Sequence, residues 1–233
     1  MTFPTLQIVV RPGILELGWG HPDPALLPVD AMRRATVAAL DKHGSNGLQY
    51  GDTRGAGPLL EWLSARIAQH EGRAPADDEI MLTGGNSAAL DMLLALVAKP
   101  GDAVLVESPT YHLALRILHD HQLEIIPIPS DGNGLRVETV AQALEKLRLA
   151  GKRACALYTV PTFNNPTGVS LSEPRRRDLV ALAEQETLLV IEDDVYRELA
   201  YDGPPPASLW SIASAGVVAR SARSRNRWRR VLD

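Results

Sequence analysis

Short apolar runs and amphipathic stretches alternate between residues 79 and 191, and this alternation constrains the fold more than any other feature of the chain. Turns bearing glycine, proline or asparagine separate them, which is typical of strands alternating with helices. The order predicts an α/β fold, a mostly parallel sheet with helices on both faces. The predicted strands are residues 79–82, 103–107, 124–128, 154–160 and 188–191, and the predicted helices are residues 30–42, 58–70, 87–98, 111–121, 137–149 and 173–185.

Composition favours a globular protein. The chain has 233 residues, of which 45% are hydrophobic and 22% charged, enough for a sizeable core. The net charge of -4 argues against a nucleic-acid or membrane partner, and no apolar run has the length of a membrane span. The N-terminus lacks the pattern of a signal peptide, and the single cysteine, Cys155, favours a reducing compartment. We therefore expect a cytoplasmic protein.

Two polar motifs directly follow predicted strands, where open α/β sheets bind their ligands. FNNPTG, residues 163–168, contains Asn165, whose amide can donate to a phenolate-type oxygen. IEDDVY, residues 191–196, contains Asp193 and Tyr196. A carboxylate just past a buried run is costly unless it is paired or hydrogen-bonded, so Asp193 is expected to face a cationic partner. The alternative is that Asp193 and Asp194 form a solvated acidic pair.

Two further candidates precede these motifs. GGNSAAL, residues 84–90, joins a predicted strand to a helix, so Gly85, Asn86 and Ser87 can bind an anion through the amides of the helix N-terminus. Tyr111 follows the next strand and can lie over a planar ligand. Taken singly, the first is better explained as a plain strand-to-helix turn and the second as a packed tyrosine. Together the five features match pyridoxal phosphate, which has a phosphate, a flat ring, a phenolic oxygen and a ring nitrogen that stays protonated. No metal site is predicted.

From about residue 15 to residue 210 the chain resembles the class I/II aminotransferases of fold type I, in particular the branch with 2-aminoadipate and kynurenine transaminases. The motifs that carry the resemblance are YGDTRG, LTGGNSAAL, KPGDAVLVESPTYH, FNNPTG and IEDDVYREL. The resemblance implies amino-group transfer from an amino acid to a 2-oxo acid in a homodimer, within amino acid metabolism and biosynthesis. It also implies a role for each candidate residue: Gly85, Asn86 and Ser87 on the cofactor phosphate, Tyr111 on the ring, Asn165 and Tyr196 on the phenolic oxygen, Asp193 on the ring nitrogen, Tyr50 on the phosphate of the partner subunit, and Gly20 with Asn165 beside the substrate.

The resemblance also implies three segments: residues 1–28 as an arm and substrate-side loop, residues 29–212 as an incomplete cofactor-binding large domain, and residues 213–233 as an aberrant basic tail. The family's Schiff-base lysine would follow Tyr196, but the four lysines, Lys42, Lys99, Lys146 and Lys152, all precede FNNPTG. No catalytic residue is therefore identified, and the small C-terminal domain is expected to be missing. Because the arginine-rich tail can be back-translated and read in another frame as a lysine-bearing family motif, we hypothesise a frameshift from about Ser221. We expect this chain to be inactive and to bind the cofactor weakly at best, without a covalent bond.

The sequence is also compatible with three other functions. A lyase or decarboxylase on the same scaffold would share every motif. A cofactor-binding effector module of a transcription regulator would share them too, although the motifs begin too near Met1 for a preceding winged helix. A plain nucleotide-binding domain would explain TGGN but not FNNPTG together with IEDDVY.

Overall fold

The computed structural model of the protein describes residues 11–15, 23–214 and 216–222. The chain divides into two compact units, residues 1–49 with 227–233, and residues 50–226. In the part of the chain that the structure describes, no helix combines the length and the apolar character needed to cross a bilayer.

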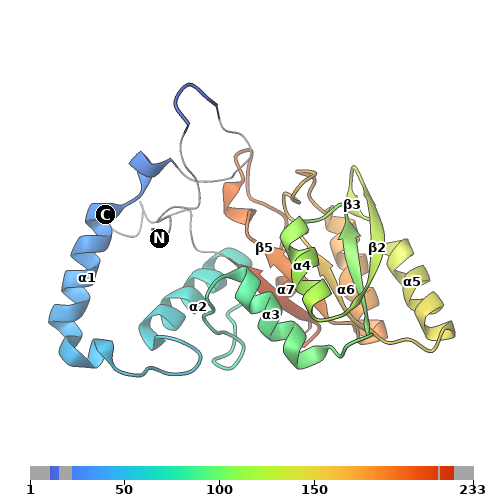
Figure 1. Cartoon of the computed structure of the whole chain (residues 1–233), viewed down its shortest axis with the longest axis horizontal. Coiled ribbons are helices and arrows are strands. Elements are labelled where there is room, and N and C mark those ends of the chain that lie inside the picture. The colour runs from blue at the N-terminus through green and yellow to red at the C-terminus, as the bar shows by residue number, and fades with distance from the viewer. Residues whose placement is uncertain (1–10, 16–22, 215, 223–233) are drawn as a thin grey trace, which may run out of the picture. The chain divides into compact units, whose positions relative to one another are not determined.

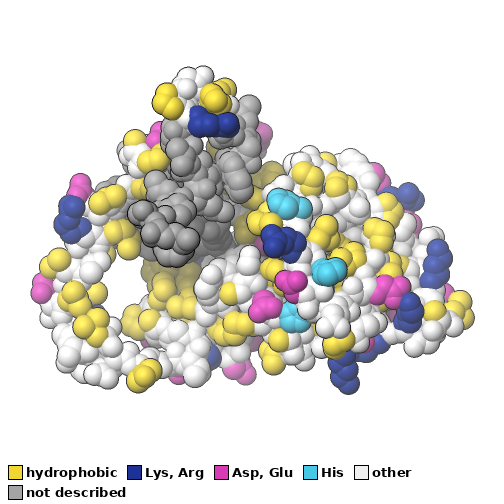
Figure 2. All heavy atoms as spheres, in the orientation of Figure 1, with side chains coloured by type: hydrophobic (Ala, Val, Ile, Leu, Met, Phe, Trp, Pro, Cys, Tyr) yellow, Lys and Arg dark blue, Asp and Glu magenta, His cyan; other side chains and the backbone are white. Residues whose placement is uncertain are grey.

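The first unit contains one long helix, α1 (Val29–His43), between the short 3-10 helices η1 (Pro24–Leu26) and η2 (Gly44–Leu48). The helix α1 ends at Gly44, which has a φ of 55° that glycine adopts readily. No residue of α1 is buried, and its apolar side chains are visible on the surface in Figure 2. The division between the units falls between residues 49 and 50. The expected segments, residues 1–28, 29–212 and 213–233, stay predictions.

The second unit is built on a six-stranded sheet with the order β3-β2-β1-β4-β5-β6. All neighbouring pairs are parallel except β2 with β3, which is a short antiparallel hairpin. The strands are β1 (Ala103–Ser108), β2 (Glu124–Asp131), β3 (Gly134–Leu135), β4 (Ala154–Thr159), β5 (Val190–Asp194) and β6 (Val218–Ala222).

Helices cover both faces of this sheet (Figure 1). Successive residues of a strand point to opposite faces, so Ala103 and Leu105 of β1 join one core cluster while Val104 and Val106 join another. The first cluster contains residues of α5 (Val137–Leu149), α6 (Glu173–Glu186) and α7 (Leu209–Ile212), and the second contains residues of α3 (Asn86–Val97) and α4 (His112–Asp120). The remaining elements of this unit are α2 (Gly57–Glu71) and the 3-10 helix η3 (Arg197–Leu199).

The predicted fold class is confirmed, as are the six predicted helices and four of the five predicted strands, within a few residues at their ends. The prediction of a strand at residues 79–82 is wrong. A strand requires a neighbour for its backbone hydrogen bonds. In the described part of the chain no strand pairs with this segment, and Leu82 N bonds instead to the carbonyl oxygen of Arg54.

The sequence pattern also failed to predict a strand in the arginine-rich end of the chain. Residues 218–222 form β6, which pairs in parallel with all five residues of β5, so this part of the expected basic tail belongs to the sheet. Residues 223–233 lie outside the described part of the chain. A groove of about 500 Å³ is lined by residues of α3, of β6 and of the segment at residues 79–83, among others.

Candidate functional site

Asp193 is the centre of the candidate site. It lies near the end of β5, is 9% exposed, and accepts hydrogen bonds on both of its carboxylate oxygens. The side-chain amide of Asn86, at the start of α3, donates to Oδ1 over 2.8 Å, and the phenol of Tyr158 donates to Oδ2 over 2.7 Å. Burial raises the pKa of Asp193, and the bonds from Tyr158 and Asn86 oppose that rise.

The neighbouring carboxylate, Asp194, has different partners. Its Oδ2 binds the guanidinium groups of Arg197 over 2.6 Å and Arg220 over 2.8 Å, and both arginines also lie within 4 Å of Glu71. Asp193 forms no ion pair with any side chain in the described residues. Asp194 therefore holds β5, β6 and α2 together, whereas the charge of Asp193 remains available to a ligand.

The second half of the site is the turn that follows β4. Asn165 donates from Nδ2 to the phenolic oxygen of Tyr196 over 3.2 Å, so the two predicted motifs meet at the carboxyl edge of the sheet. The turn is closed by Asn164, whose backbone oxygen accepts from Gly168 N and whose side-chain oxygen accepts from Thr167. This closure fixes the position of the Asn165 amide.

The third part is the N-terminus of α3. Gly85 precedes the helix with a φ of 107°, and a Cβ there would meet nothing within 4 Å. No side-chain cap bonds to this end of the helix, so its first-turn amides have no capping partner among the described residues. Gly85 and Ser87 are exposed, as an anion site requires. The Asn86 side chain is bound to Asp193 and to Ser221 over 3.1 Å, so only its backbone amide remains for an anion.

Tyr111 stands immediately before α4 and packs against the same core cluster as Tyr158 and Tyr196. Burial raises the pKa of the Tyr158 phenol far above its ordinary value, and the nearby Asp193, Tyr111 and Tyr196 raise it further. The hydroxyl oxygen of Thr110, beside Tyr111, is buried and has no partner in the described part of the structure. The structure thus brings Asn86 into contact with Asp193, and places Tyr111 and Tyr196 around Tyr158, the phenol that donates to Asp193.

Of the remaining predicted residues, Tyr50 is not brought to this site by the structure, and Gly20 is not described. Tyr50 is fully exposed, at 105% of its reference area. Gly20 lies outside the described residues. Their predicted roles, one of them across a dimer interface, stay predictions.

Sequence reasoning missed three side chains that build the site. Tyr158 is one; a phenol inside a buried run signals a hidden hydrogen-bond partner. Arg176 is fully buried and donates to the carbonyl oxygens of Leu171 over 2.8 Å and Ala207 over 3.1 Å, which orders the loops on either side of the site. Glu107 accepts from the Thr159 hydroxyl over 2.6 Å and ties the end of β1 to the end of β4.

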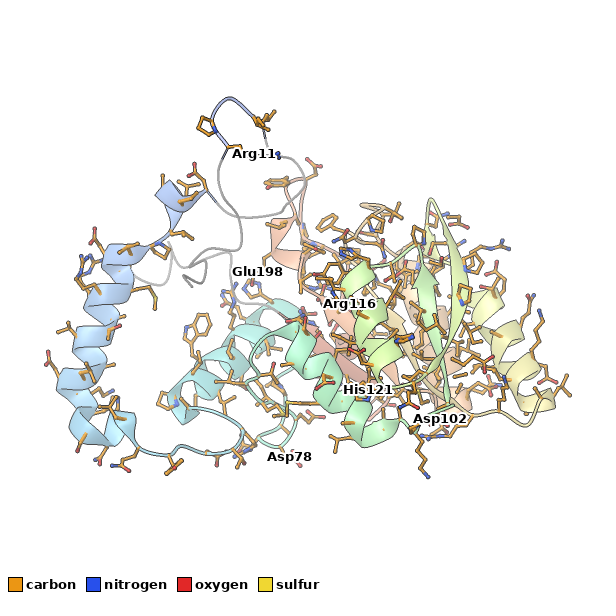
Figure 3. All side chains as sticks on the ribbon, viewed as in Figure 1. Arg11, Asp78, Asp102, Arg116, His121 and Glu198 are labelled. Carbon is orange, nitrogen blue, oxygen red and sulfur yellow. The ribbon has the colours of Figure 1, made fainter. Side chains whose placement is uncertain are left out.

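The lysines of the second unit lie at the opposite end of the sheet. Lys152 pairs with Glu124 at the first residue of β2, and the backbone amide of Lys99 donates to Asp102 just before β1. Figure 3 labels Asp102 at this end of the strands. Lys146 lies in the last turn of α5, and Lys42 belongs to the other unit. Within the described part of the second unit, no lysine lies at the candidate site.

Comparison with known proteins gives the family. Residues 13–223 match the family described as "Aminotransferase class I and II". The chain is 36% identical over 207 residues to an aromatic-amino-acid aminotransferase of Thermococcus litoralis, covering 88% of this chain and 50% of that protein. It is 31% identical over 212 residues to a 2-aminoadipate transaminase of Thermus thermophilus, covering 89% and 50%.

Solved structures agree with the sequence matches. The crystal structure of a Pyrococcus horikoshii kynurenine aminotransferase, in complex with PMP, superposes with a TM-score of 0.81 and 37% identity, covering 88% of this chain and 50% of that chain. The protein therefore spans about half the length of the relatives that it matches. The chain belongs to the class I and II aminotransferases.

Proposed function

We propose that the carboxyl edge of the sheet binds pyridoxal 5'-phosphate. We also propose that the protein is, by family, a transaminase, an enzyme that exchanges an amino group between an amino acid and a 2-oxo acid. The observation that carries this proposal is Asp193, a buried carboxylate held by two neutral donors and by no cation in the described residues. A buried charge of this kind is costly unless a ligand pairs with it. A protonated pyridine nitrogen is such a ligand.

The remaining contacts fit the rest of the cofactor. The amides of Gly85, Asn86 and Ser87 at the N-terminus of α3 would hold the phosphate, because a helix N-terminus attracts anions. Tyr111 would lie against the ring. Asn165 and Tyr196, already 3.2 Å apart, would bind the phenolic oxygen. The protonated ring supplies an electron sink for the substrate carbanion when it is bound.

The protein groups supply orientation and electrostatics. Asp193 favours the charged ring nitrogen, and its rigid hydrogen bonds fix the direction of that interaction. The Asn165 amide and the Tyr196 phenol are neutral donors suited to an anionic oxygen. The family's lysine is absent from the site in the described part of the second unit, so we expect binding without a covalent bond and no amino transfer by this chain.

Substrates, partners and location are part of the same proposal. The named relatives act on aromatic amino acids, 2-aminoadipate or kynurenine, which favours the corresponding transaminase branch. We infer a homodimer in the cytoplasm, with Tyr50 reaching the partner's cofactor phosphate and Gly20 lying near the substrate. The names of these relatives favour a transaminase over an effector module, while a lyase would share the whole site.

Binding of pyridoxamine 5'-phosphate tests the site, because this form lacks the aldehyde and cannot react with surface lysines. We expect saturable binding by calorimetry that falls at least tenfold in Asp193→Asn, since the charge that pairs with the ring nitrogen is lost. The matched control is Asp202→Asn, which removes an exposed carboxylate. Equal affinities of Asp193→Asn and the unaltered chain would refute the site.

The frame hypothesis has a separate test. Sequencing the gene beyond codon 220 should show small-domain sequence continuing in another frame if the hypothesis is correct. The product of that frame, incubated with a panel of amino acids and 2-oxoglutarate, should form glutamate if the protein is a transaminase. Cofactor binding without glutamate formation would favour an effector module or a lyase.

A further inference from the structure

Tyr158 has a position that no predicted role explains. It is a residue of β4, 1% exposed, and its phenol donates to Asp193 Oδ2 over 2.7 Å. In the sheet register Tyr158 lies opposite Ile191, so Asp193 is the next residue of β5 on the same face. The contact is therefore set by the pairing of two inner strands of the sheet and not by a loop.

The second oxygen of the same carboxylate is also held. Asn86 donates to Oδ1 over 2.8 Å, and Ser221 lies 3.5 Å from it. Donors from β4 and α3 thus hold the two oxygens, which fixes the plane of the carboxylate. A carboxylate has about four acceptor positions, so it can still accept a bond from a ligand.

The chemical nature of these donors matters as much as their position. The phenol of Tyr158 and the amide of Asn86 stabilise the negative charge of Asp193 without neutralising it. The two arginines that bind Asp194 neutralise the charge of that carboxylate. Burial and the neighbouring negative charge raise the pKa of Tyr158, so its phenol stays protonated and can only donate to Asp193. An arginine or lysine in place of Tyr158 would compete with any cationic ligand.

We propose that Tyr158 is a positioning residue that directs the Asp193 carboxylate at the ring nitrogen of the cofactor while leaving its charge free. This inference rests on the proposed function. It assigns to Tyr158 a role in selecting a planar ligand with a protonated ring nitrogen, acting through Asp193 and without touching the ligand.

The test compares two ligands in the full chain. Tyr158→Phe removes one hydroxyl and keeps the ring in the core. We expect it to weaken binding of pyridoxamine 5'-phosphate about tenfold, the equivalent of one hydrogen bond to a charged group. Binding of the 1-deaza analogue, in which C–H replaces the ring nitrogen, should change less than twofold. Tyr201→Phe, at an exposed tyrosine, is the matched control and should alter neither affinity.

A second readout requires no ligand. Carbon-13 NMR of the aspartate carboxylates in the free protein should show Asp193 titrating at higher pH in Tyr158→Phe, because a donor to its charged form is lost. The other groups on this carboxylate, Asn86, Ser221 and the charge of Asp194, are the same in both proteins. Equal weakening of both ligands, or an unchanged Asp193 titration, would overturn the proposal.

The two proposals fail differently. If the site binds no cofactor, neither ligand binds the unaltered chain, yet the Asp193 titration still reports on Tyr158. If Tyr158 has only a packing role, the ratio of the affinities for pyridoxamine 5'-phosphate and its 1-deaza analogue is the same in Tyr158→Phe as in the unaltered chain. Unfolding in urea checks that the variant is folded at the temperature of each measurement.

Discussion

Arg176 donates from Nη2 to the carbonyl oxygen of Pro161 over 2.6 Å, which links the start of α6 to the turn that carries Asn165. The same guanidinium satisfies the carbonyl oxygens of Leu171 and Ala207 and the hydroxyl of Thr162. One buried cation therefore orders the chain before and after the Asn165 turn.

Arg176→Met should reduce the free energy of unfolding by about 3 kcal/mol, because it leaves several buried carbonyl groups without donors. Urea denaturation measures this loss. Arg177→Met is the matched control: Arg177 is exposed and, among the described residues, pairs with Glu173 alone, one turn away, so the change should stay within about 0.5 kcal/mol. Similar losses in the two variants would show that the Arg176 bonds are not specific.

The contact between Asn165 and Tyr196 should contribute to binding independently of Asp193. Tyr196→Phe and Asn165→Ala each remove a donor from the expected position of the phenolic oxygen. We expect each to weaken binding of pyridoxamine 5'-phosphate about fivefold by calorimetry. If Tyr201→Phe weakened binding as much as Tyr196→Phe, the effect would not arise at this site.

Glu192 should make the folded state less stable as pH rises. Burial raises its pKa from 4.5 to about 7, the charge of Asp194 adds to the rise, and Arg220 opposes it. Between these values the folded chain keeps a proton that the unfolded chain has lost, so the free energy of unfolding falls by about 3 kcal/mol across the interval. Glu192→Gln cannot titrate and should lose less stability between pH 4.5 and 7.5 in urea unfolding. Equal losses in the two proteins would contradict this assignment.

The strand β6 should promote self-association. It pairs with β5 on one side, its other edge has no strand partner in the described residues, and the groove of about 500 Å³ runs beside it. Exposed strand edges pair with other chains, and a lysine on the edge discourages this. Ala222→Lys should therefore lower the association seen by analytical ultracentrifugation. Ala150→Lys adds the same charge after α5 and should leave association unchanged.

The sequence predicted the inner strands β1 and β4 because they are buried on both faces and so read as apolar runs. It predicted Asn165, Asp193 and Tyr196 as one group because parallel strands end at the same edge. These features depend on local pattern and on the general geometry of α/β folds. The structure confirmed that Asn165 and Tyr196 meet.

Other features depended on partners distant in the sequence, and only the tertiary structure decided them. Residues 79–82 have a strand pattern but no strand beside them in the described chain, so they form none. Residues 218–222 have no apolar periodicity, yet they pair with β5 as β6, where Asp194 and Glu71 form ion pairs with the partly buried Arg220. Tyr158 reads as one more core residue in the sequence. Its bond to Asp193 exists because β4 pairs with β5 in one register, and a register is a relation between strands that neither strand contains alone.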